Sequence, residues 1–295
     1  MAIRKIRGSI VVVTGATSGI GRETAREFAR AGARVVIAGR RKERLRELAD
    51  ELATKKIETL VMPTDVSDPS QVERLIQQTV GRFGRIDTLV NNAGVGIAAR
   101  FEEQPIEDFR RVMETNFWGA VYACKAAVPQ MRAQPSGGVI INISSILGKR
   151  GLPFETAYCA SKFALAGFSE ALRTEVMTDK IDVSTIFPGA VETEIWESAT
   201  NKTGLEMPSF LPKFPARELA RVILQDARFP QPEIVMAFDA QAMNFLNTFI
   251  PGAMDVFLGQ SVPFLEGLRR STTQSMASQS NLYQPLHRPR SKRRG

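Results

Sequence analysis

Seven short runs of apolar, mostly β-branched residues alternate with longer amphipathic patterns along this chain of 295 residues. Continuous β-branched runs are typical of parallel strands that are buried on both faces, and parallel strands need helical crossovers. Right-handed crossovers place the helices on both faces of one sheet. The pattern predicts the α/β class, a doubly wound parallel sheet of about seven strands. The runs lie at residues 10–15, 33–39, 58–65, 86–94, 137–145, 182–189 and 232–237.

The segments between these runs predict helices. Asp68 and Pro69 stand where a helix cap and a first helical residue are expected. No change in composition divides residues 1–237, so we expect one domain over that range. The predicted helices lie at about 19–31, 40–53, 69–84, 105–113, 115–133, 156–176 and 215–228.

The C-terminal part differs from the preceding domain. Residues 238–270 show two short apolar helical patterns separated by Pro251 and Gly252, which predicts a helical extension that packs on the core. A wall of the substrate pocket, a dimer contact and a membrane-surface contact remain alternatives. Residues 271–295 are rich in Ser, Gln, Pro and Arg, and we expect them to be a disordered basic tail.

The positive charge of the chain is concentrated in that tail. The formal net charge is +8, with 39 basic and 31 acidic residues. Seven of the basic residues and none of the acidic ones lie from Arg269 onward, so the preceding part holds 32 basic and 31 acidic residues. A nearly neutral folded domain does not favour nucleic acid as a partner.

The metal-binding and redox residues are few. The chain has two cysteines, Cys124 and Cys159, both in predicted helices, and its one histidine is His287 in the tail. We therefore predict no metal site and no disulfide, as in a reducing cytoplasm. The apolar run near the N-terminus is too short for a signal peptide and predicts the first strand.

Three glycines lie where the first strand passes into the first helix, in the sequence VVVTGATSGIGRETA. Gly15 can adopt the backbone geometry of a tight turn, and Gly19 and Gly21 have no Cβ to keep a pyrophosphate or a neighbouring strand away. Backbone N–H groups at the helix N-terminus would then face the phosphates. This context predicts a dinucleotide site, although a purely structural glycine turn remains an alternative.

The end of the second strand predicts which nucleotide is bound. An acidic residue there would bind the ribose 2′-hydroxyl of NAD(H), but this chain has Gly39 followed by Arg40 and Arg41. Two guanidinium groups suit the 2′-phosphate of NADP(H). The alternative is that one or both arginines belong to the solvated face of the next helix. Asp65, at the end of the third strand, could bind the adenine amino group, although a capping role suits Asp68 better.

Tyr158 and Lys162 lie four residues apart in a predicted helix, so their side chains share one face. Reduction of a carbonyl requires a proton at oxygen as well as a hydride at carbon. A free phenol has a pKa near ~10, and a cation within ~4–6 Å would lower it. Such a phenol could serve as acid in reduction and as base in oxidation. An accidental Tyr-Lys pair on a solvated helix edge is the alternative.

These motifs, in this order, resemble the short-chain dehydrogenase/reductase family over residues 10–193, which implies a Rossmann-type domain. The resemblance rests on the glycine turn at 14–21, NNAG at 91–94, Asn116, NISS at 142–145, YCASK at 158–162 and PGAVET at 188–193. It implies that Tyr158 is the general acid–base, that Lys162 lowers the pKa of the phenol and binds the nicotinamide ribose, that Ser145 rather than Ser144 holds the substrate oxygen, and that Asn116 helps to hold a water chain leading to Lys162.

The same resemblance implies the cofactor contacts. Asn92, Ala93 and Gly94 would line the adenine-ribose side, while Pro188, Val191 and Thr193 would line the nicotinamide side. The other expected contacts lie in the same motifs and beside Asp65. They are Thr17, Ser18, Ile20, Val66 and Gly189.

The expected activity is an NADP(H)-dependent interconversion of a ketone or aldehyde with an alcohol. Apolar residues near the predicted site favour a hydrophobic or bulky substrate, which is not identified. These are Leu147, Leu152, Phe154, Ile195 and Trp196. The alternative is a low-turnover NADP(H)-binding regulator or scaffold of the same fold. Members of the family usually pair through the helices at 115–133 and 156–176, so a homodimer or homotetramer is expected.

Overall fold

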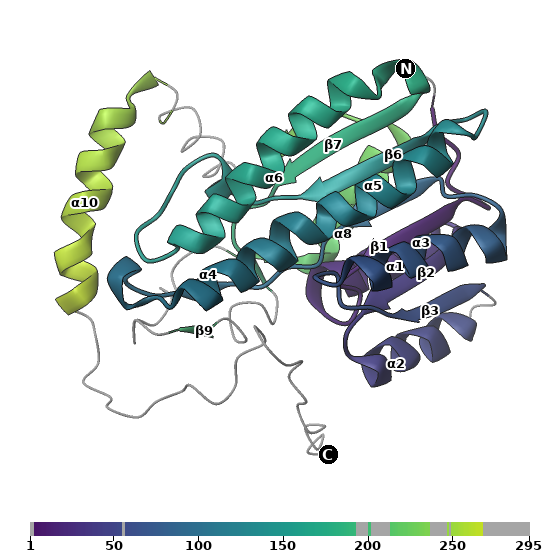
Figure 1. Ribbon diagram of the computed structural model, residues 1–295, viewed down its shortest axis with the longest axis horizontal. Coiled ribbons are helices and arrows are strands. Elements are labelled where there is room, and N and C mark those ends of the chain that lie inside the picture. Colours follow the sequence, from purple (N-terminus) through teal and green to yellow (C-terminus); the bar gives the residue numbers. More distant parts are fainter. Residues whose placement is uncertain are drawn as a thin grey trace.

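The computed structural model describes residues 3–54, 57–192, 200–201, 213–236, 247 and 249–267. A parallel sheet of seven strands forms the centre, in the order β11-β7-β6-β4-β1-β2-β3 (Figure 1). All seven predicted strands are confirmed. They are β1 (Ile10–Thr14), β2 (Arg34–Gly39), β3 (Thr59–Pro63), β4 (Thr88–Asn91), β6 (Gly138–Ile143), β7 (Ile181–Phe187) and β11 (Glu233–Val235).

Strand β1 occupies the point where the strand order reverses. It pairs with β2 on one side and with β4 on the other, so Val13 stands beside both Ile37 and Val90. In open α/β sheets, ligands bind beyond the carboxyl ends of the strands at such a reversal. The topology therefore places a binding site next to Thr14 and Asn91.

Helices cover both faces of the sheet, as the sequence predicts (Figure 1). Alternate residues of a buried strand point to opposite faces. Val11 and Val13 therefore pack in one core and Ile10 and Val12 in the other. The first core includes α1 (Gly19–Arg30), α2 (Lys42–Ala53) and α8 (Ala216–Arg228), and the second includes α3 (Pro69–Phe83), α5 (Gly119–Arg132) and α6 (Thr156–Glu175).

Asp68 caps α3 as predicted. Its side chain accepts hydrogen bonds from the backbone N–H groups of Ser70 at 2.9 Å and Gln71 at 3.3 Å, and Pro69 is the first helical residue. Gly84 ends the helix in the left-handed conformation, with φ at 77°.

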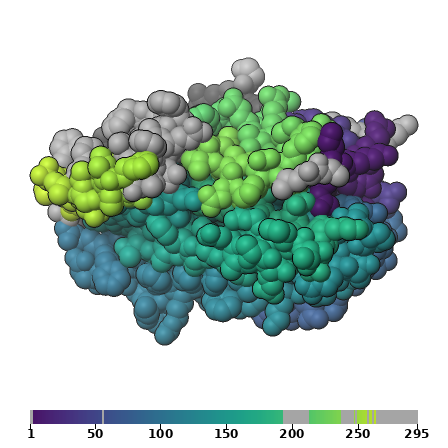
Figure 2. Space-filling view, turned by 90° about the horizontal axis from the view of Figure 1, so that it is seen from above, coloured from purple at the N-terminus to yellow at the C-terminus, as the bar shows by residue number. Residues whose placement is uncertain are grey.

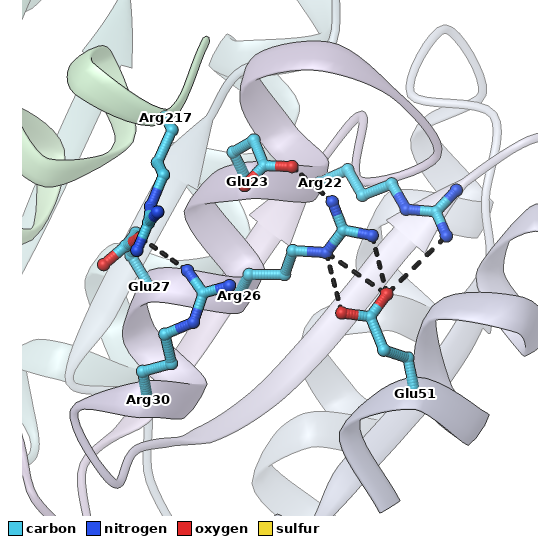
Figure 3. A network of polar contacts seen from close by, with 7 residues as sticks. All are labelled: Arg22, Glu23, Arg26, Glu27, Arg30, Glu51 and Arg217. Carbon is cyan, nitrogen blue, oxygen red and sulfur yellow. Dashed lines mark hydrogen bonds and ion pairs between the residues drawn. The ribbon is translucent and has the colours of Figure 1, made fainter. Parts of the chain in front are cut away.

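Ion pairs fix α1, which follows the glycine turn, between two other helices (Figure 3). Arg26 donates to Glu51 of α2 at 2.6 Å. On the other side of α1, the buried Glu27 accepts from Arg30 at 2.6 Å and from Arg217 of α8 at 2.9 Å. Single surface ion pairs contribute little, but shared carboxylates with restricted side chains hold the helices in one register.

Two features of the fold differ from the sequence prediction. The helix expected over 115–133 begins as a π-helix, η2 (Glu114–Trp118), which follows α4 (Ile106–Met113) and continues into α5. Two small sheets were also not predicted, because their strands have only two residues. They pair β8 (Val191–Glu192) with β10 (Phe214–Pro215), and β5 (Ile97–Ala98) with β9 (Thr200–Asn201).

The C-terminal extension contains α10 (Pro251–Gly267), which lies at the end of the molecule opposite the N-terminal residues (Figure 2). Arg150 anchors it through an ion pair with Asp255 and a hydrogen bond of 2.8 Å to the side chain of Asn247. The predictions for 238–246, 248 and 268–295 lie outside the described residues. No helix in the described part is long and apolar enough to cross a membrane.

Candidate active site

The ends of β1 and β4 are joined directly by side chains. The hydroxyl of Thr14 accepts hydrogen bonds from the backbone N–H groups of Asn92 at 3.0 Å and Ala93 at 3.1 Å. In return, the amide of Asn92 donates to the carbonyl of Thr14 at 2.9 Å. These bonds bring NNAG and the glycine turn into one structure.

Two of the glycines have no room for a side chain. Gly15 has φ at 69°, and a Cβ there would lie 2.8 Å from Cα of Ala93. A Cβ at Gly21 would lie 2.5 Å from the amide nitrogen of Asn92 and would overlap the carbonyl of Gly15. Gly19 also has a positive φ, at 51°, and Ile20 packs on the core behind the turn. The turn therefore exposes backbone rather than side chains at the N-terminus of α1.

Arg41 lies against this turn. Its guanidinium donates to the hydroxyls of Thr17 at 3.0 Å and Ser18 at 2.7 Å. Gly39 allows the approach, because a Cβ at that position would lie 2.7 Å from the methyl group of Thr17. A carboxylate at position 39 therefore has no space beside Thr17.

Arg40 is half-buried at the same edge. Burial lowers the pKa of its guanidinium, Asp65 raises it, and the positive charges of Arg41 and Arg111 lower it again. Three cations thus face one region, where an anionic ligand would relieve their repulsion.

Asp65 and Val66 have local roles besides any cofactor contact. The carboxylate of Asp65 accepts from the backbone N–H of Ser67 at 3.0 Å and from its hydroxyl at 2.7 Å. The side chain of Val66 packs against Gly119 of α5, where a Cβ would lie 2.8 Å from it. Asp65 therefore stabilises a local turn through its side chain, a role for which the sequence favoured Asp68.

The two serines after β6 have different roles. The hydroxyl of Ser144 donates to the backbone carbonyl of Lys162 at 3.0 Å, so it is engaged with α6. Ser145 caps the short helix η3 (Ile146–Gly148) by accepting from the N–H of Leu147 at 3.1 Å, and its hydroxyl is close enough to Tyr158 to lower the pKa of the phenol. This geometry agrees with the choice of Ser145 over Ser144.

Tyr158 and Lys162 come together on α6. The ammonium of Lys162 lies 5.5 Å from the centre of the Tyr158 ring and donates to the carbonyl of Ile143 at 2.9 Å. Burial lowers the pKa of Lys162 to about 8. Burial also raises the pKa of the Tyr158 phenol, as does the charge of Glu155, and the hydrogen bond with Ser145 opposes both. Without a bound cofactor, the phenol is therefore a proton donor, and burial opposes the expected lowering of its pKa by Lys162.

Buried polar bonds fix α6 to the sheet. Asn91 of β4 donates to Asn142 of β6 at 2.8 Å, and Asn142 donates to Ser169 of α6 at 2.8 Å. All three side chains are buried, so water cannot replace these bonds easily. They fix the position of the helix that carries Tyr158 and Lys162.

Asn116 supports the site from the π-helix. Its amide group accepts from the N–H of Val95 at 2.8 Å and donates to the carbonyl of Val95 at 2.9 Å. It also donates to the hydroxyl of Ser161 at 3.0 Å, which in turn donates to the carbonyl of Tyr158. The side chain of Asn116 therefore binds another side chain as well as backbone. A Cβ at Gly94 would lie 3.4 Å from the Asn116 side chain and 3.8 Å from the Lys162 ammonium, so these residues converge.

The segment after β7 closes the other side of the site. The carbonyl of Pro188 accepts from the N–H of Ile146 at 2.9 Å. This bond joins the segment after β7 to the serine turn, which is the turn that carries Ser144 and Ser145. Val191 begins β8 and is buried, and Gly189 lies between them. Thr193, Ile195 and Trp196 lie outside the described residues.

Sequence reasoning missed three residues that build the site. Thr14, Val95 and Ser161 each carry a hydrogen bond that joins two motifs. Each is within one residue of a recognised motif or inside one, and this position is the only signal that could have found them. A polar residue in a motif does not by itself show which distant backbone it binds.

The arrangement fits a dinucleotide. Gly15, Gly19 and Gly21 leave backbone exposed at the N-terminus of α1, and Arg40 and Arg41 face the neighbouring strand end. Lys162 holds a buried ammonium beside Tyr158 at the other end of the site. Exposed backbone at a helix N-terminus, followed by cations, is the donor set that phosphates require.

Comparison with known proteins decides the family. The model of the short chain dehydrogenase family matches residues 9–204. The chain belongs to this family. A short-chain dehydrogenase relative, the uncharacterized oxidoreductase YxnA of Bacillus subtilis, is 35% identical over 260 residues, which cover 86% of this chain and 72% of that protein.

Solved short-chain dehydrogenases have the same fold. L-sorbose reductase from Gluconobacter frateurii, complexed with NADPH and L-sorbose, has a TM-score of 0.71 and 31% identity, covering 80% of this chain and 96% of that one. A short-chain dehydrogenase/reductase from Burkholderia phymatum in complex with NAD has a TM-score of 0.77 and 25% identity, covering 87% and 97%. This chain is therefore a nucleotide-binding oxidoreductase that transfers hydride at a CH–OH group.

The crowded glycine turn gives a testable expectation. Gly21→Ala should lower the affinity for the dinucleotide at least about 10-fold and destabilise the fold by about 1–3 kcal/mol, because the new methyl group overlaps the backbone of Gly15. Calorimetric titration and thermal unfolding would measure the two effects.

Gly81→Ala, in the interior of α3, is the matched control. Its Cβ would meet no atom within 4 Å, so this change should leave nucleotide affinity unchanged and stabilise the protein by about 0.5–1 kcal/mol. Normal affinity in Gly21→Ala would show that the turn does not approach the phosphates.

Proposed function

We propose that the chain is an NADP(H)-dependent oxidoreductase that interconverts a ketone or aldehyde with an alcohol, with Tyr158 as the general acid–base. The observation that carries the proposal is the placement of Tyr158 beside Ser145, which lowers the pKa of the phenol, with the Lys162 ammonium 5.5 Å from the centre of the phenol ring. A proton donor, a neutral hydrogen-bonding group and a buried cation thus meet at one point.

Tyr158, Ser145 and Lys162 each have a separate role in carbonyl reduction. The bound nicotinamide supplies the hydride. Tyr158 donates its proton to the carbonyl oxygen, on which negative charge grows as the hydride arrives. Ser145 donates a hydrogen bond to the same oxygen without competing for the proton. Lys162 stabilises the phenolate that remains, because its charge lies close to the ring in a buried environment.

Asn116 contributes by holding the loop at Val95 and the helix at Ser161 together. Both partners border the site, one after NNAG and the other inside YCASK. The proposed water chain to Lys162 would begin at this residue. Apolar side chains near Tyr158, among them Ile146, Leu147 and Leu152, favour a hydrophobic substrate.

Tyr158→Phe tests the enzymatic function. It should bind NADPH within about threefold of the parent protein, since only the hydroxyl is lost, and should lose at least about 10³-fold in kcat for carbonyl reduction. Stopped-flow and steady-state assays on a panel of ketones would measure both quantities.

Tyr122→Phe on α5 is the control for that experiment and should leave kcat unchanged, because the Tyr122 hydroxyl contacts Glu114 instead. The alternative function is a low-turnover NADP(H)-binding regulator or scaffold. It would be supported if the parent protein bound NADPH but had no more turnover than Tyr158→Phe.

The preference for NADP(H) is supported by the edge of β2. Position 39 has no room for a ribose-binding carboxylate, and Arg40 and Arg41 follow it at the edge of the glycine turn. A 2′-phosphate there would be bound by charge-assisted hydrogen bonds, which are stronger than those between neutral groups.

Arg40→Asp combined with Arg41→Ala should therefore weaken NADPH at least about 100-fold and NADH by less than about threefold, measured as dissociation constants. Arg46→Ala, which removes a guanidinium from the exposed side of α2, is the control and should change neither constant. Equal affinities of the parent protein for NADPH and NADH would contradict the preference.

We also propose a homodimer or homotetramer that pairs through α5, its preceding π-helix and α6. Exposed aromatic side chains occur on both, with Trp118 41% and Phe163 45% exposed, and Trp118 stacks on Tyr122 at 6.0 Å. Large aromatic side chains are enriched at interfaces and costly in water.

Trp118→Glu combined with Phe163→Glu should convert the oligomer into a monomer, as measured by light scattering. Ile106→Glu, at another exposed apolar position, on α4, should leave the mass unchanged. A monomeric parent protein at micromolar concentration would refute the proposed pairing.

A further inference from the structure

The face of α6 that carries Tyr158 and Lys162 extends one turn further toward the start of the helix. Tyr158 and Cys159 lie four and three positions before Lys162 on one face of α6, and Glu155 stands just before the helix, where its carbonyl accepts from the N–H of Cys159 at 2.8 Å. Glu155 therefore lies beyond Tyr158, on the side away from Lys162. Its charge raises the pKa of both Tyr158 and Cys159, so the carboxyl is close to both.

The carboxyl of Glu155 is not used to build the helix. Glu155 is the N-cap residue of α6, where an acidic side chain usually accepts hydrogen bonds from the first backbone N–H groups, yet its side chain makes no such bond. Among the described residues, none supplies a hydrogen bond or a charge that shifts its pKa, which burial raises to about 8. Such a half-buried acid is costly unless a ligand uses it.

The turn before α6 holds this residue in place. Phe154 has φ at 68°, a strained conformation for a bulky residue, and its carbonyl accepts from the N–H of Ala99 at 2.9 Å. The N–H of Leu152 donates to the sulfur of Cys159 at 3.5 Å. Backbone strain that the surroundings maintain in this way often marks a ligand site.

The neighbouring cations are engaged with other partners. Lys149 pairs with Glu233 at 2.7 Å, Arg150 pairs with Asp255, and Arg100 pairs with Glu102 at 3.0 Å. The remaining surroundings are apolar, since Ile146, Leu147, Leu152 and Val235 pack around Tyr158 and Cys159. Among the described residues, Glu155 thus places a hydrogen-bonding carboxyl beside an apolar wall, about one helical turn from the phenol of Tyr158.

We propose that Glu155 is a specificity-determining residue that donates a hydrogen bond to a second, neutral oxygen of the substrate, about one helical turn from the reacting carbonyl. The proposal rests on the proposed function, because Tyr158 fixes the position of the first oxygen. It names a substrate class, namely apolar carbonyl compounds with a keto, ether or hydroxyl oxygen on the far side.

The protonation state of Glu155 decides which oxygen it can bind. At neutral pH the carboxyl is mostly protonated and can donate a hydrogen bond, like other carboxylic acids that apolar sites keep neutral. As the pH rises through about 8, the group ionises and repels an acceptor oxygen. The preference for substrates with a second oxygen should therefore be lost at high pH, while reduction of simple ketones depends on Tyr158 and Lys162 and not on Glu155.

A matched pair of ketones tests the proposal. The two oxygens of 1,4-cyclohexanedione are separated by about one helical turn, and 4-methylcyclohexanone has the same ring without the second oxygen. The ratio of their kcat/KM values is compared among the parent protein, Glu155→Gln and Glu155→Leu, because intrinsic reactivity cancels in this comparison.

The ratio is kcat/KM for 1,4-cyclohexanedione divided by kcat/KM for 4-methylcyclohexanone. At pH 7 this ratio should be at least about 10-fold lower in Glu155→Leu than in the parent protein, and within about threefold of the parent in Glu155→Gln, which keeps a donor. In the parent protein it should also fall as the pH rises through about 8, and in Glu155→Gln it should not. Glu175→Leu, at the exposed end of the same helix, should leave the ratio unchanged. The thermal unfolding temperature of Glu155→Leu should be no lower than that of the parent, since the change removes a half-buried, unpartnered acid.

An unchanged ratio in Glu155→Leu would overturn the proposal and leave the proposed function intact, provided that turnover still depends on Tyr158. A ratio that rises above pH 8 would show that the ionised group is preferred, which also overturns it. If the parent protein reduced other ketones of the panel but neither of these two, the proposal alone would fail, and if it reduced no ketone with NADPH or NADH, the proposed function would fail as well.

Discussion

The hydrogen bonds between the ends of β1 and β4 are the constraint on which the site depends. Thr14 binds the backbone of Asn92 and Ala93, and Asn92 binds the carbonyl of Thr14. These bonds hold the glycine turn and NNAG so close together that Gly15 and Gly21 cannot carry side chains. Because the strand order reverses between these two strands, the same bonds that close the sheet also create the edge where a dinucleotide can bind.

A second set of buried bonds transmits this geometry to the catalytic helix. Asn91 is the last residue of β4, and its amide is joined through Asn142 to Ser169 on α6. Lys162 of the same helix reaches back to the carbonyl of Ile143 at the end of β6. The helix that carries the phenol of Tyr158 is therefore positioned by contacts with the ends of both β4 and β6. Short polar side chains, rather than apolar packing alone, hold this helix in register.

The sequence predicted the sheet and the start of α3 well, because both depend on local patterns. Runs of valine and isoleucine identify buried strands, and Asp68 with Pro69 identifies a helix start. The π-helix at 114–118 could not be foreseen from local sequence. It carries Asn116, whose side chain binds the backbone of Val95, 21 residues away. The partners of Arg41 were hidden for the same reason, because they depend on how closely two turns approach. Glu155 belongs to no motif, and what distinguishes it, a half-buried carboxyl without a cap bond, is visible only in the structure.

The anchoring of α10 has a consequence for the exchange of parts between related proteins. Arg150 follows the short helix that begins after Ser145, and it holds both Asn247 and Asp255, about a hundred residues further along the chain. The backbone carbonyl of Lys149 accepts from Asn247 at 3.1 Å as well. A chimera that receives a foreign C-terminal segment would leave this guanidinium without its acceptors, directly beside the serine turn. In a chimera, the C-terminal segment and the residue at position 150 should therefore be exchanged together and not separately.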